Sequence, residues 1–148
     1  MKKIQKGKVL AVNISDDKGT KKTNVQRCDL VKDFGLKGDA HAGPWHRQVS
    51  LLANESIEKM KAMGLKVGYG NFAENITTEG IDLVHLPIGT TIRIGDSVTL
   101  RVTQIGKECH TRCAIYYQAG DCVMPKEGIF AEVLHEGEVK VGDQIIIG

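Results

Sequence analysis

Two short segments with the same turn chemistry constrain the fold of this chain most strongly. The segments IRIGDSV (residues 92–98) and VKVGDQI (residues 139–145) both place Gly-Asp between stretches in which apolar and polar residues alternate. Such alternation is typical of half-buried β-strands, and Gly-Asp between two of them predicts a tight hairpin or a sharp bend of the strand. The match covers only these short segments, and shared turn chemistry explains it without a duplicated domain.

The β pattern extends over most of the chain. Strands are predicted over Lys8–Ser15, Asn24–Val31, Gln48–Leu52, Ile92–Ile94, Val98–Ile105, Gly128–His135 and Glu138–Ile147. Few helices are available to cover open sheet edges, and closure of the sheet pairs the backbone groups that an edge strand exposes. The expected fold class is therefore mainly β, a closed or nearly closed antiparallel β-barrel with one or two short helices.

One helix is clearly expected after the strand that ends at Leu52. Asn54 offers a side-chain oxygen for an N-cap, and Glu55 and Glu58 suit the positive end of the helix dipole. Gly64 supplies a C-terminal stop, so the helix spans about three turns.

Length and composition indicate one globular domain over residues 1–148. The chain is 41% hydrophobic and 26% charged, and its 17 glycines favour a fold with many tight turns. No apolar run approaches the roughly 18 residues of a membrane span, and the apolar stretch near the start is too short for a signal peptide. We therefore expect a cytoplasmic protein with no membrane association.

The formal net charge of +2 combines a basic N-terminal part with an acidic remainder. Residues 1–27 contain eight Lys or Arg and two Asp, whereas the rest of the chain contains twelve Lys or Arg and sixteen Asp or Glu. A basic arm can attract nucleic acid, but these lysines are not interleaved with aromatic residues. A solvated basic edge is the preferred interpretation, and no nucleic-acid partner is expected.

The four cysteines are best interpreted as reduced thiols, because no secretory signal accompanies them. Cys28 lies in a strand pattern, where a small buried thiol is common. Cys109 follows the end of a strand. If the backbone stays extended there, Lys107 lies on the same side as Cys109, and its ammonium favours the thiolate. The thiolate is the form that attacks sulfur, bears a persulfide or binds a soft metal.

Cys113 and Cys122 leave two interpretations open. A structural zinc site normally shows two closely spaced ligand pairs, whereas here C-x3-C is followed by a lone cysteine. Otherwise the two thiols are buried neighbours of the reactive one. A zinc-binding or purely structural module therefore stays as an alternative.

A second group of polar residues lies in the glycine-rich stretch GLKGDAHAGPWHRQ. Its small residues let backbone N–H groups approach a ligand, and Asp39 could orient a neighbouring histidine. The donors that suit an oxyanion or phosphate are His41, His46 and Arg47. A structural loop with solvent-facing histidines is an equally good interpretation. In a third stretch, GNFAENITTEG, an asparagine in the place of Asn75 more often caps a turn than contacts a ligand.

Together these stretches resemble the MOSC domain, a family named for its place at the C-terminus of molybdenum cofactor sulfurases. The blocks that carry the resemblance run in the family's order: GLKGDAHAG followed by RQVSLL, then GNFAENITTEGIDL, IRIGDSVTLRVTQIGKEC and GIFAEVLHEGEVKVGDQI. They cover essentially the whole chain from Lys8 onward. The resemblance implies a strand-rich barrel that handles the molybdenum cofactor or activated sulfur.

The resemblance also implies roles for particular residues. The family's hallmark cysteine, just after the VTQ strand, falls on Cys109, which would carry a persulfide or ligate molybdenum. Asp39 would brace the residues that contact the cofactor's phosphate and pterin groups, which are His41, Arg47, Asn75 and Lys107. Glu108 stands where a proline is common. Cys113 and Cys122 also depart from the common pattern, which leaves open a resolving thiol that discharges a persulfide as a disulfide.

The leading functional interpretation is molybdenum cofactor (molybdopterin) binding, sulfur carriage through Cys109, or both, in cofactor biosynthesis or sulfuration. The implied partners are a pyridoxal-phosphate-dependent cysteine desulfurase or other cofactor biosynthesis proteins. The alternative is a molybdenum-dependent reductase of N-hydroxylated compounds. It would need a separate electron donor, because the chain shows no Rossmann glycine motif and no ferredoxin-type cysteine spacing. No pyridoxal phosphate is expected on this chain, since 148 residues leave no room for a desulfurase domain.

Overall fold

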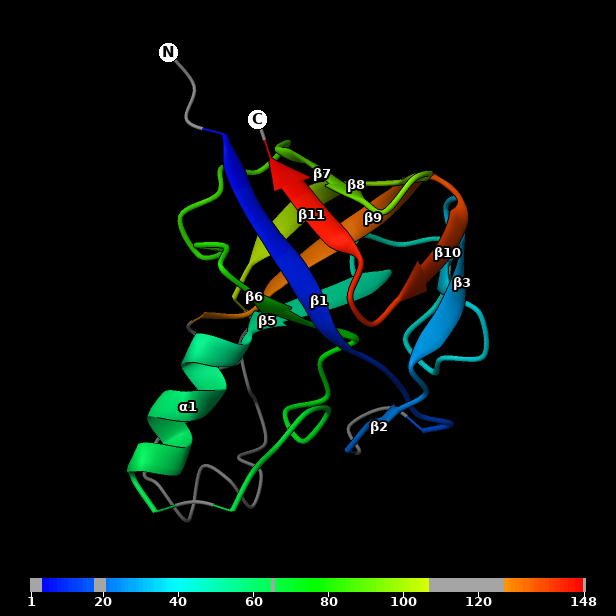
Figure 1. The fold of residues 1–148 in the computed structure, drawn as a ribbon. Coiled ribbons are helices and arrows are strands. Elements are labelled where there is room, and N and C mark those ends of the chain that lie inside the picture. Colours follow the sequence, from blue (N-terminus) through cyan, green and yellow to red (C-terminus); the bar gives the residue numbers. More distant parts are fainter. Residues whose placement is uncertain (1–3, 18–20, 65, 107–126, 148) are drawn as a thin grey trace.

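A closed ring of seven strands forms the body of the molecule (Figure 1). The computed structural model describes residues 4–17, 21–64, 66–106 and 127–147. Around the ring the strands are β11 (Gln144–Ile147), β7 (Thr91–Ile94), β8 (Val98–Ile105), β9 (Ile129–His135), β5 (Val49–Ala53), β6 (Ile76–Glu79) and β1 (Gln5–Ile14). β1 pairs again with β11 and closes the ring. The predicted mainly-β closed barrel is confirmed.

One pair in the ring is parallel, and the number of strands requires it. Each antiparallel pair reverses the strand direction, so a ring closes only when it contains an even number of antiparallel pairs. A ring of seven pairs therefore needs at least one parallel pair. β5 and β6 form that pair, with Leu51 opposite Ile76, and the other six pairs are antiparallel. The expected antiparallel pairing holds at those six pairs, and β5–β6 departs from it.

The single helix of the described residues, α1 (Asn54–Ala62), lies in the connection between β5 and β6. A tight turn cannot join parallel neighbours, so the chain must cross over, and α1 with the loop after it makes the crossing. The helix projects below the barrel in Figure 1. Its buried face packs Ile57 and Met60 against Phe72 and Phe130.

The ends of α1 agree with the sequence prediction at one end only. The predicted stop at Gly64 is confirmed, because its φ is +92° and its N–H donates to the carbonyl of Lys61 (2.9 Å). The predicted N-cap is wrong. Ala53 occupies that position in extended conformation and makes no side-chain capping hydrogen bond, and Asn54 is already the first helical residue. The helix starts directly where β5 ends, which leaves Asn54 no room outside the first turn.

A smaller sheet lies beside the barrel and contains β10 (Gly137–Lys140), β3 (Arg27–Val31) and β4 (Gly35–Leu36) in that order. β2 (Thr23–Asn24) pairs with the end of β1. The two Gly-Asp segments act differently. The first joins β7 to its partner β8 as a hairpin, whereas the second bends the chain from β10 in the small sheet to β11 in the barrel.

Aliphatic side chains fill the barrel interior. The fully buried ones include Leu51, Ile76, Ile92, Ile94, Leu100, Ile129 and Ile145, and they come from β5, β6, β7, β8, β9 and β11. Burial of this apolar area is the main favourable contribution to folding. The interior is therefore a packed core, and functional side chains have to lie at its ends or outside it.

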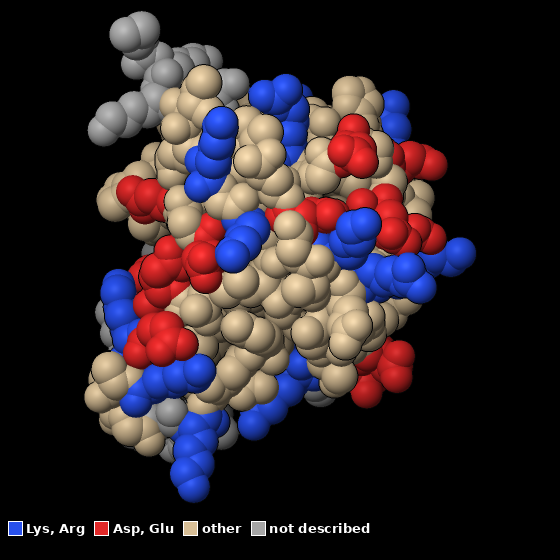
Figure 2. Space-filling view, in the orientation of Figure 1, with Lys and Arg blue, Asp and Glu red and all other residues tan. Residues whose placement is uncertain are grey.

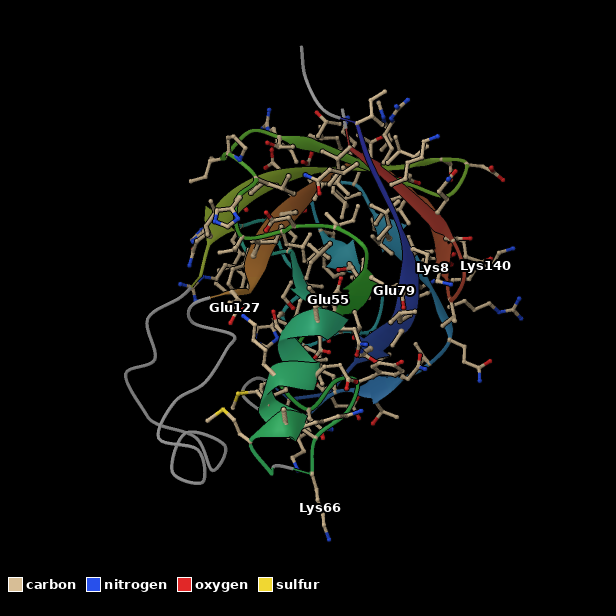
Figure 3. The ribbon with its side chains drawn as sticks, turned by 60° about the vertical axis from the view of Figure 1, so that its left-hand side comes forward. Lys8, Glu55, Lys66, Glu79, Glu127 and Lys140 are labelled. Carbon is tan, nitrogen blue, oxygen red and sulfur yellow. The ribbon has the colours of Figure 1, made fainter. Side chains whose placement is uncertain are left out.

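Several charged side chains on the surface form local ion pairs. Lys8 on β1 lies beside Glu79 on β6 (Figure 3), with 3.8 Å between Nζ and Oε1. On the face shown in Figure 2, Lys and Arg side chains lie among Asp and Glu side chains instead of forming one continuous basic patch. No helix in the described part of the chain combines the length and apolar character needed to cross a membrane.

The close approach of β1 to β6 predicts an effect of substituting Gly7. An added Cβ would lie 2.2 Å from the carbonyl oxygen of Glu79, so β1 must move away from β6. We expect Gly7→Ala to lower the free energy of unfolding by about 1–3 kcal/mol, measured by urea denaturation. Gly68→Ala is the control, because its Cβ meets no described atom within 4 Å. It should leave stability unchanged or raise it by up to about 1 kcal/mol; equal effects of the two substitutions would contradict the packing.

Candidate functional site

A fully buried ion pair organises the glycine-rich chain between β4 and β5. Lys22 Nζ lies 2.7 Å from Asp39 Oδ1, and neither side chain is exposed. Asp39 Oδ1 also accepts the backbone N–H of Ser15 (3.0 Å), and Oδ2 accepts that of His41 (3.2 Å). The carboxylate therefore ties the end of β1 to the segment that carries His41.

The environment of Asp39 keeps its carboxylate ionised. Burial by itself would raise the pKa of Asp39, but hydrogen bonds from the Lys22 side chain, the Asn75 side chain and the Ser15 backbone outweigh it. The positive charge of Lys22 acts in the same direction. The net result is a pKa below the ordinary aspartate value, so the buried pair is a true ion pair at neutral pH.

Lys22 is a site residue that the sequence interpretation missed. It belongs to the basic N-terminal part, which was predicted to be a solvated edge, yet its side chain is buried because Asp39 compensates its charge. Its backbone is held as well, since its N–H donates to the carbonyl of Gly70 (2.8 Å). A Cβ on Gly70, whose φ is +82°, would lie 2.1 Å from the Lys22 carbonyl oxygen. Only glycine allows this approach.

Lys22 also contacts His41 directly. The ammonium lies 3.0 Å from His41 Nδ1 and donates to Ser15 Oγ (3.1 Å). His41 itself is partly buried, and its carbonyl accepts the indole N–H of Trp45 (2.8 Å). The predicted orientation of a histidine by Asp39 thus takes a specific form: the carboxylate holds the backbone of His41, and Lys22 contacts the ring.

Asn75 is fully buried at the start of β6 and joins three strands. Its Oδ1 accepts the N–H and the Oγ–H of Ser50 on β5 (2.9 and 3.1 Å), and its Nδ2 donates to the carbonyl of Asn13 on β1 (3.1 Å). The side chain also hydrogen-bonds Asp39. Its amide is therefore committed to internal hydrogen bonds that hold the cluster together.

A second buried carboxylate, Glu74, fixes the loop that covers Lys22. Its Oε2 accepts the N–H of Gly70 (3.1 Å) and the hydroxyl of Thr77 (2.7 Å). Burial raises the pKa of Glu74 above the ordinary value, although these hydrogen bonds oppose the rise. Nothing in its sequence context distinguished Glu74 from an exposed loop residue.

Arg47 lies where β8 ends. Its Nε donates to Gln104 Oε1 (3.1 Å), and its guanidinium lies over the ring of Phe130, 5.2 Å from the ring centroid. Gln104 in turn donates to the carbonyl of Gly106 (2.7 Å), the last described residue before residue 107. Arg47 is thus held in place at the point where the chain continues toward Cys109.

The described structure brings the predicted residues into two neighbouring groups. Asp39, His41 and Asn75 share one cluster around Lys22. Arg47 is connected to that cluster through Phe130, which lies opposite Ser50 in the pairing of β9 with β5. His46, the other predicted donor, is exposed and lies edge-on against Trp45, with 5.7 Å between the ring centroids.

Residues 107–126 lie outside the described residues, and with them the predicted Lys107 and Cys109 as well as Cys113 and Cys122. The two sides of this segment are anchored. The N–H of Gly106 donates to the carbonyl of Gly128 (2.6 Å), and Glu127 accepts hydrogen bonds from Ser56 and Lys59 on α1 (2.9 and 2.8 Å). Cys109 is therefore three residues along the chain from an anchored position beside Gln104, the partner of Arg47.

Cys28, the cysteine that the structure describes, lies on β3 and packs against the core while remaining partly exposed. Its thiol donates to the carbonyl of Lys37 (3.3 Å). Burial and the nearby charge of Asp29 raise its pKa above the ordinary value. It is a protonated thiol at neutral pH. Its position on a strand agrees with the sequence pattern, but the thiol is only partly buried, whereas that pattern favoured a buried one.

Two surface pockets lie apart from these residues. One, of about 380 Å³, lies between α1 and residues 80–84 and is lined by Glu55 and Glu127, both visible in Figure 3. The other, of about 630 Å³, is lined by His85, Ile88 and Arg93, among others. Neither contains a residue predicted for the cofactor site.

Comparison with known proteins identifies the family. The sequence model of the MOSC domain matches residues 38–146, which is most of the chain. The chain belongs to the MOSC domain family. The matched range begins just before Asp39 and includes Arg47, Asn75 and Cys109, whereas Lys22 precedes it. No curated protein matches the sequence at a significant level.

Several solved structures are similar to this MOSC domain. The YUAD protein from Bacillus subtilis superimposes with a TM-score of 0.82 at 20% identity, covering 99% of this chain and 98% of that one. YiiM from Geobacillus stearothermophilus superimposes with a TM-score of 0.70 at 17% identity, covering 96% of this chain and 75% of that one. YiiM from Escherichia coli superimposes with a TM-score of 0.67 at 18% identity, covering 97% of this chain and 69% of that one. At these identities the likeness concerns the fold alone.

The buried pair predicts a pH-dependent loss of stability in Asp39→Asn. At neutral pH the substitution leaves the Lys22 ammonium buried without a counter-charge, so we expect the free energy of unfolding to fall by about 3–5 kcal/mol. The folded-state pKa of Asp39 is lowered, so its stabilisation is present above the unfolded value of about 3.9 and lost as pH falls through the folded value. The difference in the free energy of unfolding between the unmodified protein and Asp39→Asn should therefore become smaller below about pH 4.

Urea denaturation across this pH range measures the effect. Glu58→Gln is the control, because Glu58 forms an exposed pair with Lys61. Its loss should change stability by less than about 1 kcal/mol. A difference between the unmodified protein and Asp39→Asn that is small, or that does not depend on pH, would contradict a buried ion pair.

Proposed function

We propose that this MOSC domain binds the molybdenum cofactor, carries sulfur as a persulfide, or does both in cofactor biosynthesis or sulfuration, with the Cys109 thiolate as its reactive group. The main support is that the ionised Asp39 carboxylate assembles Lys22, His41 and Asn75 within a domain of this family. Arg47 adds a positioned cation at the end of β8, close along the chain to Cys109. The proposed setting is the cytoplasm.

The described donors fit an anionic pterin cofactor in kind. A guanidinium held on an aromatic ring and by an amide, as Arg47 is by Phe130 and Gln104, suits the planar recognition of phosphate. His41 would contribute a second donor. Asn75 and Asp39 would position these groups, because both side chains are committed to internal hydrogen bonds. Lys107 and Cys109 would complete the site, and a thiolate is a soft ligand that suits molybdenum.

Sulfur carriage uses the same thiolate. The Cys109 thiolate would attack the outer sulfur of a persulfide on a cysteine desulfurase. The new S–S bond forms on Cys109 as the donor's S–S bond breaks, and the donor leaves as a thiolate while the proton stays with the transferred sulfur. Cationic groups near Cys109 would favour the thiolate that this step needs. The desulfurase would be a partner protein, and it would hold the pyridoxal phosphate.

The proposal competes with two other functions. A molybdenum-dependent reductase of N-hydroxylated compounds would hold the same cofactor and take electrons from a partner protein. A zinc or structural module would leave the thiols inert or bind zinc through them. In the described residues no group of three or more His, Cys, Asp or Glu side chains could hold a metal ion. The identity of the bound metal and the mass of the protein discriminate among the proposed function, the reductase and the zinc or structural module.

Replacing Cys109 should abolish loading without unfolding the protein. We expect Cys109→Ala purified from a host that makes the cofactor to contain no molybdenum or pterin, and to gain no sulfur after treatment with a cysteine desulfurase and cysteine. Metal analysis by mass spectrometry and the intact protein mass measure the two kinds of loading. Cys28→Ser is the matched control, because Cys28 is a protonated thiol on β3, and it should load like the unmodified protein.

The outcomes of this experiment discriminate among the functions. Molybdenum with pterin supports cofactor binding, and a gain of one sulfur atom per chain supports carriage. Molybdenum together with turnover of an N-hydroxylated substrate, once an electron donor is added, would support the reductase. Zinc in the unmodified protein, or loading that survives Cys109→Ala, would contradict the proposal.

Removing the Arg47 cation should weaken retention of the anionic cofactor. A hydrogen bond to a charged group contributes about 1.5–3 kcal/mol, so Arg47→Gln should raise the dissociation constant by roughly tenfold to a hundredfold. The molybdenum content after dialysis against competing apo-acceptor measures this. Arg101→Gln is the control, because Arg101 lies on β8, is half-exposed and pairs with Glu132. Equal loss in both variants would indicate a general electrostatic effect and contradict a specific role for Arg47.

A further inference from the structure

The contacts of the buried Lys22 ammonium determine where the hydrogens of the site lie. An ammonium has three N–H donors and no acceptor. Lys22 Nζ has three polar neighbours within hydrogen-bond distance: Asp39 Oδ1 at 2.7 Å, Ser15 Oγ at 3.1 Å and His41 Nδ1 at 3.0 Å. The Ser15 hydroxyl donates its own hydrogen to the carbonyl of Asp17 (2.9 Å), so its oxygen accepts from Lys22. Each Lys22 hydrogen therefore has one acceptor.

This arrangement leaves one role for His41 Nδ1. Two nitrogens 3.0 Å apart form a hydrogen bond only if one of them accepts, and the ammonium cannot. The Lys22 ammonium donates to the ionised carboxylate of Asp39, its partner in the fully buried pair. His41 Nδ1 must then present its lone pair to Lys22. In a neutral imidazole with an unprotonated Nδ1, the hydrogen is on Nε2.

We propose that Lys22 is a positioning residue that fixes His41 as the Nε2–H tautomer. A ring in this state is neither a base nor a metal ligand at Nε2. It suits an acceptor atom, such as a phosphate or oxo oxygen of an anionic ligand. The statement about the ligand depends on the function proposed above, whereas the tautomer does not. Lys22 lies before the range matched by the family model, so the match does not assign this role to it.

The two ring nitrogens can be observed directly by ¹⁵N NMR correlation with the ring carbon-bound hydrogens. The measurement is made on the unmodified protein at roughly pH 8, where an unperturbed histidine is almost entirely neutral. His41 is assigned by the signal that disappears in His41→Gln. We expect the shift of an unprotonated nitrogen at Nδ1 and of a protonated one at Nε2. A protonated Nδ1, or shifts averaged between the two tautomers, would overturn the inference.

His85 supplies an internal reference of the opposite kind. Its Nδ1 lies 2.7 Å from Asp82 Oδ2, and a carboxylate can only accept, so this contact favours the Nδ1–H tautomer. Both residues are exposed, so exchange with the other tautomer is expected there. The ¹⁵N shifts of His41 should therefore indicate a proton on Nε2, whereas those of His85 should favour a proton on Nδ1. The His85 shifts should be averaged between the two tautomers, and the His41 shifts should not.

Substitution of the two neighbouring lysines tests whether Lys22 is responsible. Lys22→Met removes the donor, and the His41 Nδ1 signal should move toward the protonated position. Lys21→Met, at an exposed neighbour, should leave it unchanged. An unchanged His41 spectrum in a folded Lys22→Met protein would overturn the role of Lys22. If Lys22→Met does not fold, the spectrum of the unmodified protein decides.

The donor role is tested by cofactor loading. Gln carries an amide N–H near the position of His Nε2, so His41→Gln should retain molybdenum and pterin. The affinity of His41→Leu for the cofactor should be lower by about tenfold or more. Equal loading of His41→Leu and the unmodified protein would overturn the donor role. Failure of the unmodified protein to load any cofactor would count against the proposed function, while the NMR result would still decide the tautomer.

Discussion

Closure of an odd ring of strands is the constraint on which the rest of the structure depends. Seven strands cannot close with antiparallel pairs alone, and the parallel pair of β5 and β6 requires a crossover. The crossover contains α1 and the loop that carries Gly70, Glu74 and Asn75. The topology of the barrel thus brings a long connection against the end of β1, where Asn13 bonds to the carbonyl of Glu74 and to the Asn75 side chain.

This connection makes the burial of charge possible. Gly70 lies against the backbone of Lys22, Glu74 fixes the loop, and Asn75 ties β1 to β5. Under this cover Lys22 and Asp39 are inaccessible to water, so each stabilises the other strongly, and both impose fixed positions on His41. If a ligand binds here, side chains already held by these contacts would lose little further freedom, which would reduce the entropy cost of binding.

Periodicity predicted the barrel because strand alternation, turn glycines and the scarcity of helical patterns can be recognised locally in the sequence. The strand position of Cys28 and the stop at Gly64 were predictable for the same reason. The parallel pair was not, since strand number and direction are properties of the closed ring. The burial of Lys22 was not predicted, because Lys21 and Lys22 have the same sequence context. What distinguishes them is the ion pair of Lys22 with Asp39, which lies far along the chain. The interpretation of Asn54 as an N-cap failed because β5 runs directly into α1.

We propose that the cluster around Lys22 and Asp39, together with Arg47, forms one wall of a molybdenum cofactor site completed by Cys109. The most direct measurement is a crystal structure of the protein purified from a host that makes the cofactor, with anomalous scattering recorded at the molybdenum absorption edge. We expect one anomalous peak at the Cys109 sulfur, with the pterin and phosphate density bounded by His41 and Arg47. A peak in the pocket lined by His85 and Arg93, or cofactor density remote from Arg47, would contradict it.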